Sequence, residues 1–423
     1  MKKTHQVKEK MRAILVDVID SRTPKADAEK RLIEMENLVN TYGGIVVMKA
    51  IQKRGMPDYD TYIGKGKLDE IIKMGEEIGA DILIINNILK PKQVFNIDEA
   101  LVKVNMKSWD RVDLILKIFD KHATTTEAKL QIELAAIKHM GPRIYNMGID
   151  LSQQAGARGT LGGSGETNIE IMKRHLQGHQ LTLLKKLEHY ELINKGHRDR
   201  RKRQNFQSVA IVGYTNAGKS SLLNALTGKE LYIADELFAT LDTRVAKIYI
   251  PPETHSEDGT YIPGREIMLS DTIGFIQDLP PDLIQAFKST LAEAISADLI
   301  LHTIDINDPD VFEKIDVVED ILKQLGLQDR KKMYVFNKVD LLAHRIVFED
   351  EEQVPEMKRE GGLVKAGAYA SHMLGWTDHK KHSAAAKLVL DLKKKYKEFQ
   401  PIFVSAHQKV NLEKLIKAID KVV

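Results

Sequence analysis

The sequence predicts an α/β protein with an N-terminal parallel-sheet domain, a helical linker and a second α/β domain. Over residues 11–106, short apolar runs alternate with segments of helical period, which is typical of parallel strands covered by helices on both faces. Apolar strand-like runs return from residue 209 onward, each leading into a glycine-containing or polar motif. The 423 residues suffice for two or three domains, and we expect them to span residues 1–152, 153–203 and 204–423.

In the first domain, each expected element is marked by its period and by its ends. The first helix begins at Thr23-Pro24, an N-cap followed by a proline at the first helical position, and Gly43-Gly44 ends it. The expected strands are Ala13–Val18, Ile45–Met48, Asp81–Ile85 and Val104–Met106. The expected helices are Pro24–Tyr42, Lys67–Ile78, Gln93–Leu101 and Thr125–Met140, the last with Leu130, Leu134 and Ile137 as its core-facing stripe.

Composition excludes several classes of protein. Without cysteine, the chain cannot use disulfides, iron–sulfur clusters, thiolate zinc sites or a cysteine nucleophile. The 43% hydrophobic and 29% charged residues are ordinary for a globular protein. Apolar stretches such as Ile82–Ile85 fall far short of the roughly 18 residues of a membrane span, and the charged N-terminus does not resemble a signal peptide. We therefore expect a cytoplasmic protein with no membrane span.

One short segment of the first domain, Tyr62–Lys67, is both glycine-rich and basic. Its backbone could approach a phosphate. We favour a tight strand-to-helix turn instead, because short glycine motifs have low specificity.

The linker combines a glycine-rich stretch with a basic helix. Residues 153–167 hold five glycines and almost no large apolar side chains, so they form either a plain linker or a loop that lies on RNA. Helical spacing continues over residues 169–190, as one long helix or as a helical hairpin that bends at Gly178. From Met172 to Arg203, ten Lys and Arg outnumber three acidic residues, a local charge of +7 against +3 for the whole chain. The run is either a solvated helix face or a surface for a polyanion.

The strongest chemical signal is the motif G-x-x-x-x-G-K-S at Gly213–Ser220. It lies between an apolar strand, Val209–Val212, and a helix over Ser221–Leu226. In this context the loop N–H groups and the helix N-terminus bind the α- and β-phosphates of a nucleotide. Lys219 would contact the β- and γ-phosphate oxygens, and Ser220 would coordinate Mg²⁺.

Two later motifs select the base. Asn337-Lys338-Val339-Asp340 follows an apolar strand, and the Asp340 carboxylate can accept hydrogen bonds from guanine N1–H and N2–H₂, which adenine lacks. Ser405-Ala406 ends a further strand, where a backbone N–H can reach guanine O6. We therefore expect GTP and GDP as ligands.

Two motifs between these loops are typical of a nucleotide switch. Asp271-Thr-Ile-Gly274 ends a strand, so Asp271 can hold Mg²⁺ through water and the Gly274 N–H can contact the γ-phosphate. Thr240, in Leu237–Thr240, is the second expected hydroxyl ligand of Mg²⁺.

Five motifs in this order predict a Ras-like P-loop GTPase domain. The expected catalytic residues are Lys219, Thr240 and Gly274, and the expected metal ligands are Ser220, Thr240 and Asp271. The residues expected to bind the nucleotide are Gly213, Tyr214, Thr215, Asn216, Ala217, Gly218, Lys219, Ser220, Ser221, Phe238, Asp271, Asn337, Lys338, Asp340, Ser405 and Ala406.

Two positions bear on the rate of hydrolysis. Phe275 follows Gly274, where a glutamine would orient the attacking water, so we hypothesise that hydrolysis is slow until a partner supplies this positioning. Asn216 in the phosphate-binding loop suggests a second hypothesis, a K⁺ ion beside the phosphates, as in some GTPases with this residue.

Several segments together match one family. They are Gly213–Ser220, Leu237–Asp242, Asp271–Pro280 and Ala286–Leu291 in the second α/β domain, and Thr61–Lys67, Lys129–Ala135 and Gly165–Thr167 before it. With them the chain resembles the HflX family of ribosome-associated GTPases. The resemblance implies an N-terminal α/β domain, a helical linker and a GTPase domain that binds the large ribosomal subunit and its RNA. It also implies splitting or rescue of stalled ribosomes, and in some members ATP hydrolysis by the N-terminal domain.

The chain departs from the family pattern in three places. Thr243-Arg244 follows Leu237–Asp242 directly, which shortens the first switch segment, and Gly162–Gly165 replaces a shorter Gly-Pro-Gly. An insertion of about residues 343–382 follows Asp340 and contains His372, His379 and His382. Since no carboxylate–histidine spacing there is distinctive, we favour a mobile surface insertion over a metal site.

The leading hypothesis is a GTP-hydrolysing factor for stalled ribosomes, a monomer that needs Mg²⁺ and is stimulated by its partner. One alternative is a guanine-nucleotide switch for another RNA or protein partner, in which the basic linker is only solvated. Another is ATP-dependent RNA remodelling by the first domain, although that domain lacks G-x-x-x-x-G-K-[ST].

Overall fold

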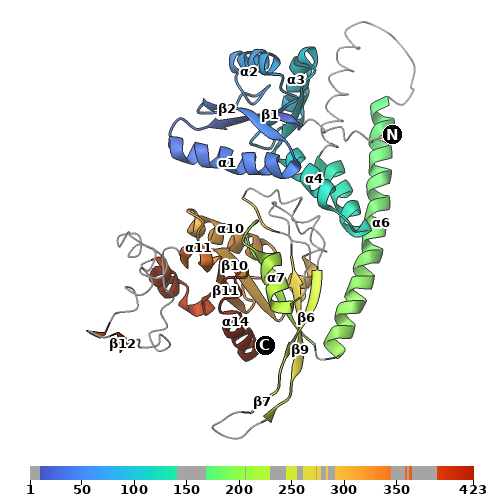
Figure 1. Ribbon diagram of the computed structural model, residues 1–423. Coiled ribbons are helices and arrows are strands. Elements are labelled where there is room, and N and C mark those ends of the chain that lie inside the picture. Colours follow the sequence, from blue (N-terminus) through green and yellow to red (C-terminus); the bar gives the residue numbers. More distant parts are fainter. Residues whose placement is uncertain are drawn as a thin grey trace, which may run out of the picture. The chain divides into compact units, whose positions relative to one another are not determined.

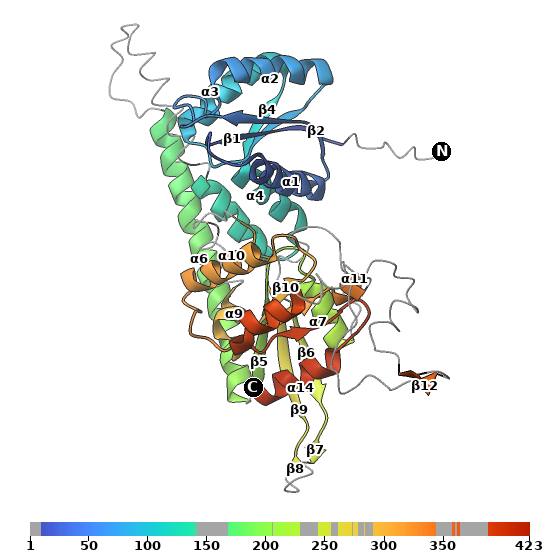
Figure 2. The ribbon, with the colours of Figure 1, turned by 90° about the vertical axis from the view of Figure 1, so that its left-hand side faces the viewer.

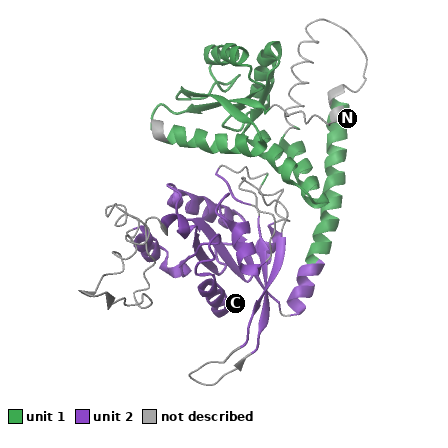
Figure 3. Ribbon diagram, in the orientation of Figure 1, with its two compact units in different colours: residues 1–195, 236–241, 280–288 green, residues 196–235, 242–279, 289–423 purple. Residues whose placement is uncertain are grey.

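The computed structural model describes most of both α/β domains and the helix between them. The described residues are 10–139, 141, 168–204, 206–228, 244–254, 261–272, 274–277, 283, 291–343, 358–359, 362–363 and 388–423. The chain forms two compact units, residues 1–195 with 236–241 and 280–288, and residues 196–235 with 242–279 and 289–423 (Figure 3). The glycine-rich stretch 153–167 lies outside the described residues, and so do His372, His379 and His382 of the insertion.

The first unit contains a four-stranded parallel sheet in the order β2-β1-β3-β4, which confirms the predicted α/β class. Its strands are β1 (Arg12–Ile19), β2 (Ile45–Lys53), β3 (Ile82–Ile85) and β4 (Lys107–Asp110). Its helices are α1 (Lys25–Tyr42), α2 (Lys65–Ile78), α3 (Pro91–Leu101) and α4 (Arg111–His122). Helices α2 and α3 cover one face, and α1 and α4 pack against each other on the opposite face (Figures 1 and 2). Strands β1 and β3 are therefore apolar and buried on both faces.

The end of this sheet differs from the prediction. The expected strand at Val104–Met106 is wrong: residues Val102–Val104 form a 3₁₀ turn, and Asn105 adopts a left-handed conformation with φ 55°. The true strand, β4, carries polar residues and lies at the sheet edge, so an apolar run does not mark it. Helix α4, which follows directly, was not predicted. Helix α1 also begins one residue later than expected, with Pro24 as its N-cap.

A second helical layer completes this unit. The predicted helix after residue 125 is present over residues 126–139, and its Leu130 and Leu134 pack against Leu183 of α6 (Asn168–Arg203). Helix α6 is one continuous helix of 36 residues, so the helical-hairpin alternative is wrong. A single glycine in a helix interior costs only about 1 kcal/mol, which explains why Gly178 does not interrupt it.

The second unit contains a six-stranded sheet in the order β14-β11-β10-β5-β9-β6, parallel except for β6, which pairs antiparallel with β9. The strands are β5 (Gln207–Val212), β6 (Arg244–Ile250), β9 (Arg265–Asp271), β10 (Leu299–Asp305), β11 (Lys332–Asn337) and β14 (Ile402–Phe403). Short antiparallel pairs are β7 (Glu253–Thr254) with β8 (Tyr261–Ile262), and β12 (Lys358–Arg359) with β13 (Gly362–Leu363) in the insertion. The helices are α7 (Lys219–Thr227), α9 (Ala292–Ser296), α10 (Val311–Gln324), α11 (Val339–Ala343), residues 388–395 and α14 (Leu412–Val422).

Two hydrophobic clusters hold this sheet between helices. Leucines of α7 and α14 pack on one face, and α10 packs with Tyr334, Phe336 and Tyr396 on the other. Because five strands of this sheet are parallel, their carboxyl ends lie at one edge, and the loops that follow them meet there. Among the described residues, no helix is both long enough and apolar enough to cross a membrane.

Candidate functional site

The predicted phosphate-binding loop connects β5 to α7 at the carboxyl edge of the second sheet. Gly213 and Gly218 have φ values of 154° and 86°, a range that side chains rarely adopt. A Cβ atom on Gly213 would overlap the Thr303 carbonyl oxygen of β10, and one on Gly218 would overlap the Asn337 amide nitrogen of β11. The two glycines are therefore required both by the backbone of the loop and by its close approach to the neighbouring strands.

Lys219, the first residue of α7, lies beneath this loop. Its side chain is nearly fully buried and donates to the Tyr214 carbonyl oxygen at 2.9 Å, which curls the loop around the ammonium group. Burial lowers the pKa of Lys219 to about 8; the nearby Asp271 carboxylate acts in the opposite direction, and the positive charge of Lys338 adds to the lowering. The residue is thus a buried cation for which a polyanionic ligand would be a strong partner.

The switch motif lies directly against the phosphate-binding loop. The Ser220 hydroxyl donates to Asp271 at 2.6 Å, and the Thr272 hydroxyl donates to the Ile211 carbonyl oxygen at 2.8 Å. A Cβ atom at Gly274 would stand 2.9 Å from the Thr215 Cγ2 atom and 3.0 Å from the Thr215 Cα atom, so a glycine lets the motif approach the loop this closely. A hydroxyl beside a carboxylate is a donor set that suits Mg²⁺.

Phe275 continues this contact through its main chain. Its N–H donates to the Gly213 carbonyl oxygen at 3.1 Å, and its carbonyl oxygen accepts from the Thr215 N–H at 2.7 Å. The Gln277 N–H donates to the Tyr214 hydroxyl at 2.9 Å. The Phe275 ring is buried, so the residue after Gly274 belongs to the packing of the domain rather than to a solvent-facing position.

The base-selecting motifs meet at Asn337. Its amide nitrogen donates to the Ala217 carbonyl oxygen at 3.0 Å, and its amide oxygen accepts from the Ala406 N–H at 3.0 Å. The Ser405 hydroxyl donates to Asp340 at 2.6 Å. Segments that are far apart in the sequence thus form one site at the sheet edge.

The structure brings together most of the residues predicted to form the site. They are Gly213, Tyr214, Thr215, Asn216, Ala217, Gly218, Lys219, Ser220, Asp271, Gly274, Asn337, Lys338, Asp340, Ser405 and Ala406, with Ser221 in the first turn of α7. Phe238 and Thr240 lie outside the described residues.

Sequence reasoning missed two supporting residues at the end of β10, Asp305 and Asn307. Asp305 pairs with the Lys338 ammonium at 2.8 Å, and the Asn307 amide donates to the Lys338 carbonyl oxygen at 2.7 Å. They hold Lys338 in a left-handed conformation with φ 65°. The available signal was the position of these polar residues at the end of an apolar strand, Leu299–Asp305.

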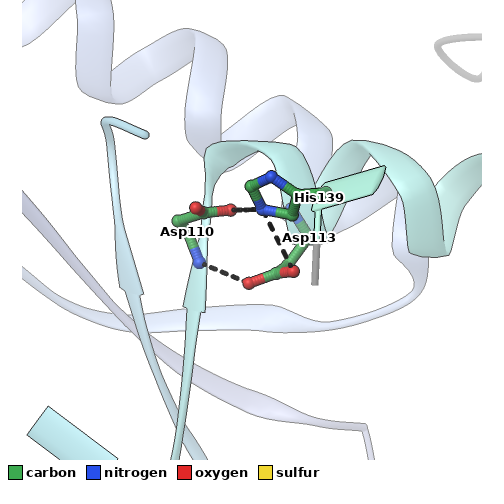
Figure 4. A group of neighbouring side chains, drawn as sticks. All are labelled: Asp110, Asp113 and His139. Atoms are coloured by element: carbon green, nitrogen blue, oxygen red, sulfur yellow. Dashed lines mark hydrogen bonds and ion pairs between the residues drawn. The ribbon is translucent and has the colours of Figure 1, made fainter. Parts of the chain in front are cut away.

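A second polar group lies in the first unit, at the start of α4 (Figure 4). One potential ligand atom each from Asp110, Asp113 and His139 lies within 4.8 Å of the others. Asp110 is buried and accepts from the Asp113 N–H at 2.9 Å and from the Leu89 N–H at 3.2 Å, and His139 contacts its carboxylate at 3.1 Å. The amide contacts make Asp110 the cap of α4. An aspartate at an N-cap is a recognisable helix start in a sequence, and Asp110 could have indicated α4.

Comparison with known proteins assigns the family. Residues 29–120, 122–201 and 208–338 match the family models described as GTP-binding GTPase N-terminal, GTP-binding GTPase Middle Region and 50S ribosome-binding GTPase. GTPase HflX of Caldanaerobacter subterraneus subsp. tengcongensis is 44% identical over 335 residues, which cover 79% of this chain and 74% of the relative. The chain belongs to the HflX family of GTPases. GTPase HflX of Escherichia coli K12 is 36% identical over 326 residues, or 77% and 73% of the two chains.

Membership of the HflX family identifies the chain as a GTP-binding GTPase. P-loop GTPases generally use Mg²⁺, and the Ser220–Asp271 pair fits that ion. Among solved structures, a complex of SsGBP with GDP aligns with 97% of this chain and 98% of its own at 26% identity and a TM-score of 0.48.

The pKa of Lys219 makes nucleotide affinity depend on pH. Bound phosphates favour the charged ammonium of Lys219. Because the pKa of Lys219 is about 8, most of the nucleotide-free protein carries a neutral amine when the pH is higher, and binding must then take up a proton. We expect the affinity for GDP to weaken, by at most roughly tenfold per pH unit, as the pH rises above about 8. Titration calorimetry at several pH values measures this. Lys219→Met, which has no titrating group at this position, is the control for deprotonation of guanine N1. An identical pH profile in both proteins would contradict the prediction.

Proposed function

We propose that the chain is a GTP-hydrolysing factor that binds the large ribosomal subunit and splits or rescues stalled ribosomes. The observation that carries this proposal is a guanine-nucleotide site in the same unit as the basic end of α6. There Arg200, Lys202 and Arg203 are exposed, while Arg201 turns inward and pairs with Glu293 at 2.6 Å. The basic end is thus held on the nucleotide-binding unit. The match of residues 208–338 to a model described as a 50S ribosome-binding GTPase supports the same partner.

In this proposal the loop from Gly213 to Ser221 binds the phosphates, through its N–H groups and the positive end of the α7 dipole. Lys219 contacts the β- and γ-phosphates and, with Gly274, stabilises the charge that develops on the transferred group. Ser220, Asp271 and Thr240 hold Mg²⁺, which neutralises phosphate charge when it is bound. Phe238 belongs to the same switch segment as Thr240 and contacts the nucleotide.

In the same proposal, guanine is bound by the loops that carry Asp340 and Ala406. Asp340 accepts from guanine N1–H and N2–H₂, and the Ala406 N–H donates to guanine O6. Asp340 also accepts from the Ser405 hydroxyl at 2.6 Å, so this hydroxyl orients its carboxylate. Asn337 and Lys338 join this loop to the phosphate-binding loop and complete the pocket for the base.

We also propose that the protein works as a cytoplasmic monomer. Its domains are residues 1–152, the linker 153–203 and the GTPase domain 204–423, with the insertion at about 343–382.

Hydrolysis in this proposal is slow without a partner. A phenyl side chain cannot orient water by hydrogen bonding, and the Phe275 ring is buried in the domain. Docking to the ribosomal subunit supplies the missing positioning.

The proposed function predicts that purified large ribosomal subunits raise the GTP hydrolysis rate by at least about tenfold, below the roughly 10³–10⁵-fold that a partner-supplied arginine gives in some GTPases. Phosphate release is measured with and without subunits, with Lys219→Ala as the inactive control. Small subunits at equal concentration control for non-specific RNA. A rate that does not change with large subunits would refute the proposed partner while leaving GTP hydrolysis itself intact.

We further propose that K⁺ binds beside the phosphates through Asn216, which lies in the loop with φ 60°. A monovalent cation there would add positive charge against the transferred phosphoryl group. We expect faster hydrolysis in KCl than in NaCl at equal ionic strength, with the difference lost in Asn216→Ala. Equal rates of the unsubstituted protein in the two salts would exclude a K⁺ site.

A further inference from the structure

An exposed aromatic ring marks a surface of the first unit that the nucleotide site does not involve. The loop between β2 and α2, residues 54–64, presents Tyr59 with 72% of its surface exposed. Met56 of the same loop and Ile88 of the β3–α3 connection are exposed as well. We call Met56, Tyr59, Ile88, Lys90 and Lys92 the Tyr59 surface. Large apolar side chains that are exposed close to one another are typical of an interaction site.

The loop that carries Tyr59 is held in one conformation. Asp58 and Tyr62 exchange backbone hydrogen bonds of 2.8 and 3.0 Å across it, and the Asp58 carboxylate accepts from the Asp60 N–H at 2.9 Å. Two side chains of α3 hold it from outside: Gln93 donates to the Asp58 carbonyl oxygen at 2.8 Å, and Asn96 to the Asp60 carbonyl oxygen at 2.9 Å. The ring is therefore presented on a preorganised loop, and a ligand would gain contact area at little entropic cost.

Two lysines at the start of α3, Lys90 at its N-cap and Lys92 in its first turn, stand over this ring. The Lys90 and Lys92 ammonium groups lie 5.8 and 5.1 Å from the Tyr59 ring centroid, within the range of cation–π contacts. Lys92 also pairs with Asp60 at 2.9 Å, and the two flanks of the loop add the exposed Lys53 and Lys65. The aromatic ring therefore lies among cations, which matches an anionic ligand with a flat face.

The surface also lies where open parallel sheets bind ligands. Strand β1 pairs with β2 on one side and β3 on the other, so the strand order reverses between β1 and β3. The loop after β2 extends from the carboxyl end of its strand to α3, which follows β3, and thus spans this reversal. In such folds ligands bind outside the carboxyl ends of the strands at this position.

We propose that Tyr59 stacks against an unpaired RNA base while Lys90 and Lys92 neutralise the adjacent phosphates. Stacking on a protein aromatic requires a base that is not already stacked in a duplex, and it tolerates any base because each has a π-face. A protein partner would match the apolar groups, but the lysines around the ring favour a polyphosphate backbone. The inference deepens the proposed function, on which it rests for the RNA partner, by naming the kind of nucleotide and the residues that bind it.

The test measures binding of fluorescein-labelled single-stranded oligoadenylate to the full chain by anisotropy. Tyr59→Ala should weaken binding by about fivefold or more, and Tyr59→Phe should bind within about twofold of the unsubstituted protein, because the ring rather than the hydroxyl makes the contact. Tyr249→Ala, at an exposed tyrosine of the other unit, is the matched control and should have no effect. Lys90→Gln should reduce the slope of log affinity against log salt, because it removes one phosphate contact.

Two results would overturn the inference: equal oligoadenylate affinity of Tyr59→Ala and the unsubstituted protein, or preference for the same strand annealed to oligouridylate. Co-sedimentation of the unsubstituted protein with large subunits separates this failure from that of the proposed function. If the protein co-sediments and Tyr59→Ala does so equally well, the inference fails and the function stands. If the unsubstituted protein does not co-sediment but its oligoadenylate binding depends on Tyr59, the proposed function fails and the stacking of Tyr59 on an unpaired base stands. Intrinsic GTP hydrolysis of Tyr59→Ala should equal that of the unsubstituted protein.

Discussion

The proposed nucleotide site depends on one side chain, Asn337, which joins the loop predicted to bind phosphates to the loops predicted to bind the base. Its amide donates to Ala217 in the first loop and accepts from Ala406 in the last, both at 3.0 Å. Gly218 must be a glycine partly because a Cβ atom there would overlap this amide. Two loops 120 residues apart in sequence are therefore joined by a direct hydrogen bond.

Sheet geometry explains why these loops can meet. Strands β5, β9, β10, β11 and β14 are parallel neighbours, so the loops that follow them emerge at one edge. The apolar residues of these strands and of α7, α10 and α14 bury both faces and fix the strand order, while the polar motifs stay at the strand ends. The same principle operates in the first unit, where the loops after β2 and β3 carry the Tyr59 surface. In both units the core determines which distant segments become neighbours, and the loops supply the chemistry.

The sequence predicted the parts of the fold that have strong local signals. Apolar runs identified the buried strands β1 and β3, and glycine spacing located the turn between β5 and α7. Strand β4 was missed because an edge strand with Lys107 and Asp110 has no apolar run. The continuity of α6 could not be predicted, because helical period is the same in one helix and in a hairpin. The roles of Asp305 and Asn307 depend on the pairing of β10 with β11, which no local pattern records.

The most direct test of this account is the affinity of Asn337→Leu for GDP, measured by titration calorimetry together with the thermal unfolding midpoint. Leucine has a similar volume but can make neither hydrogen bond of the asparagine. We predict that GDP binding weakens by about tenfold or more, while the domain still unfolds in one cooperative transition, since two hydrogen bonds of about 1 kcal/mol each are lost from the pocket. An unchanged affinity for GDP in a folded Asn337→Leu protein would contradict the claim that this residue holds the site together.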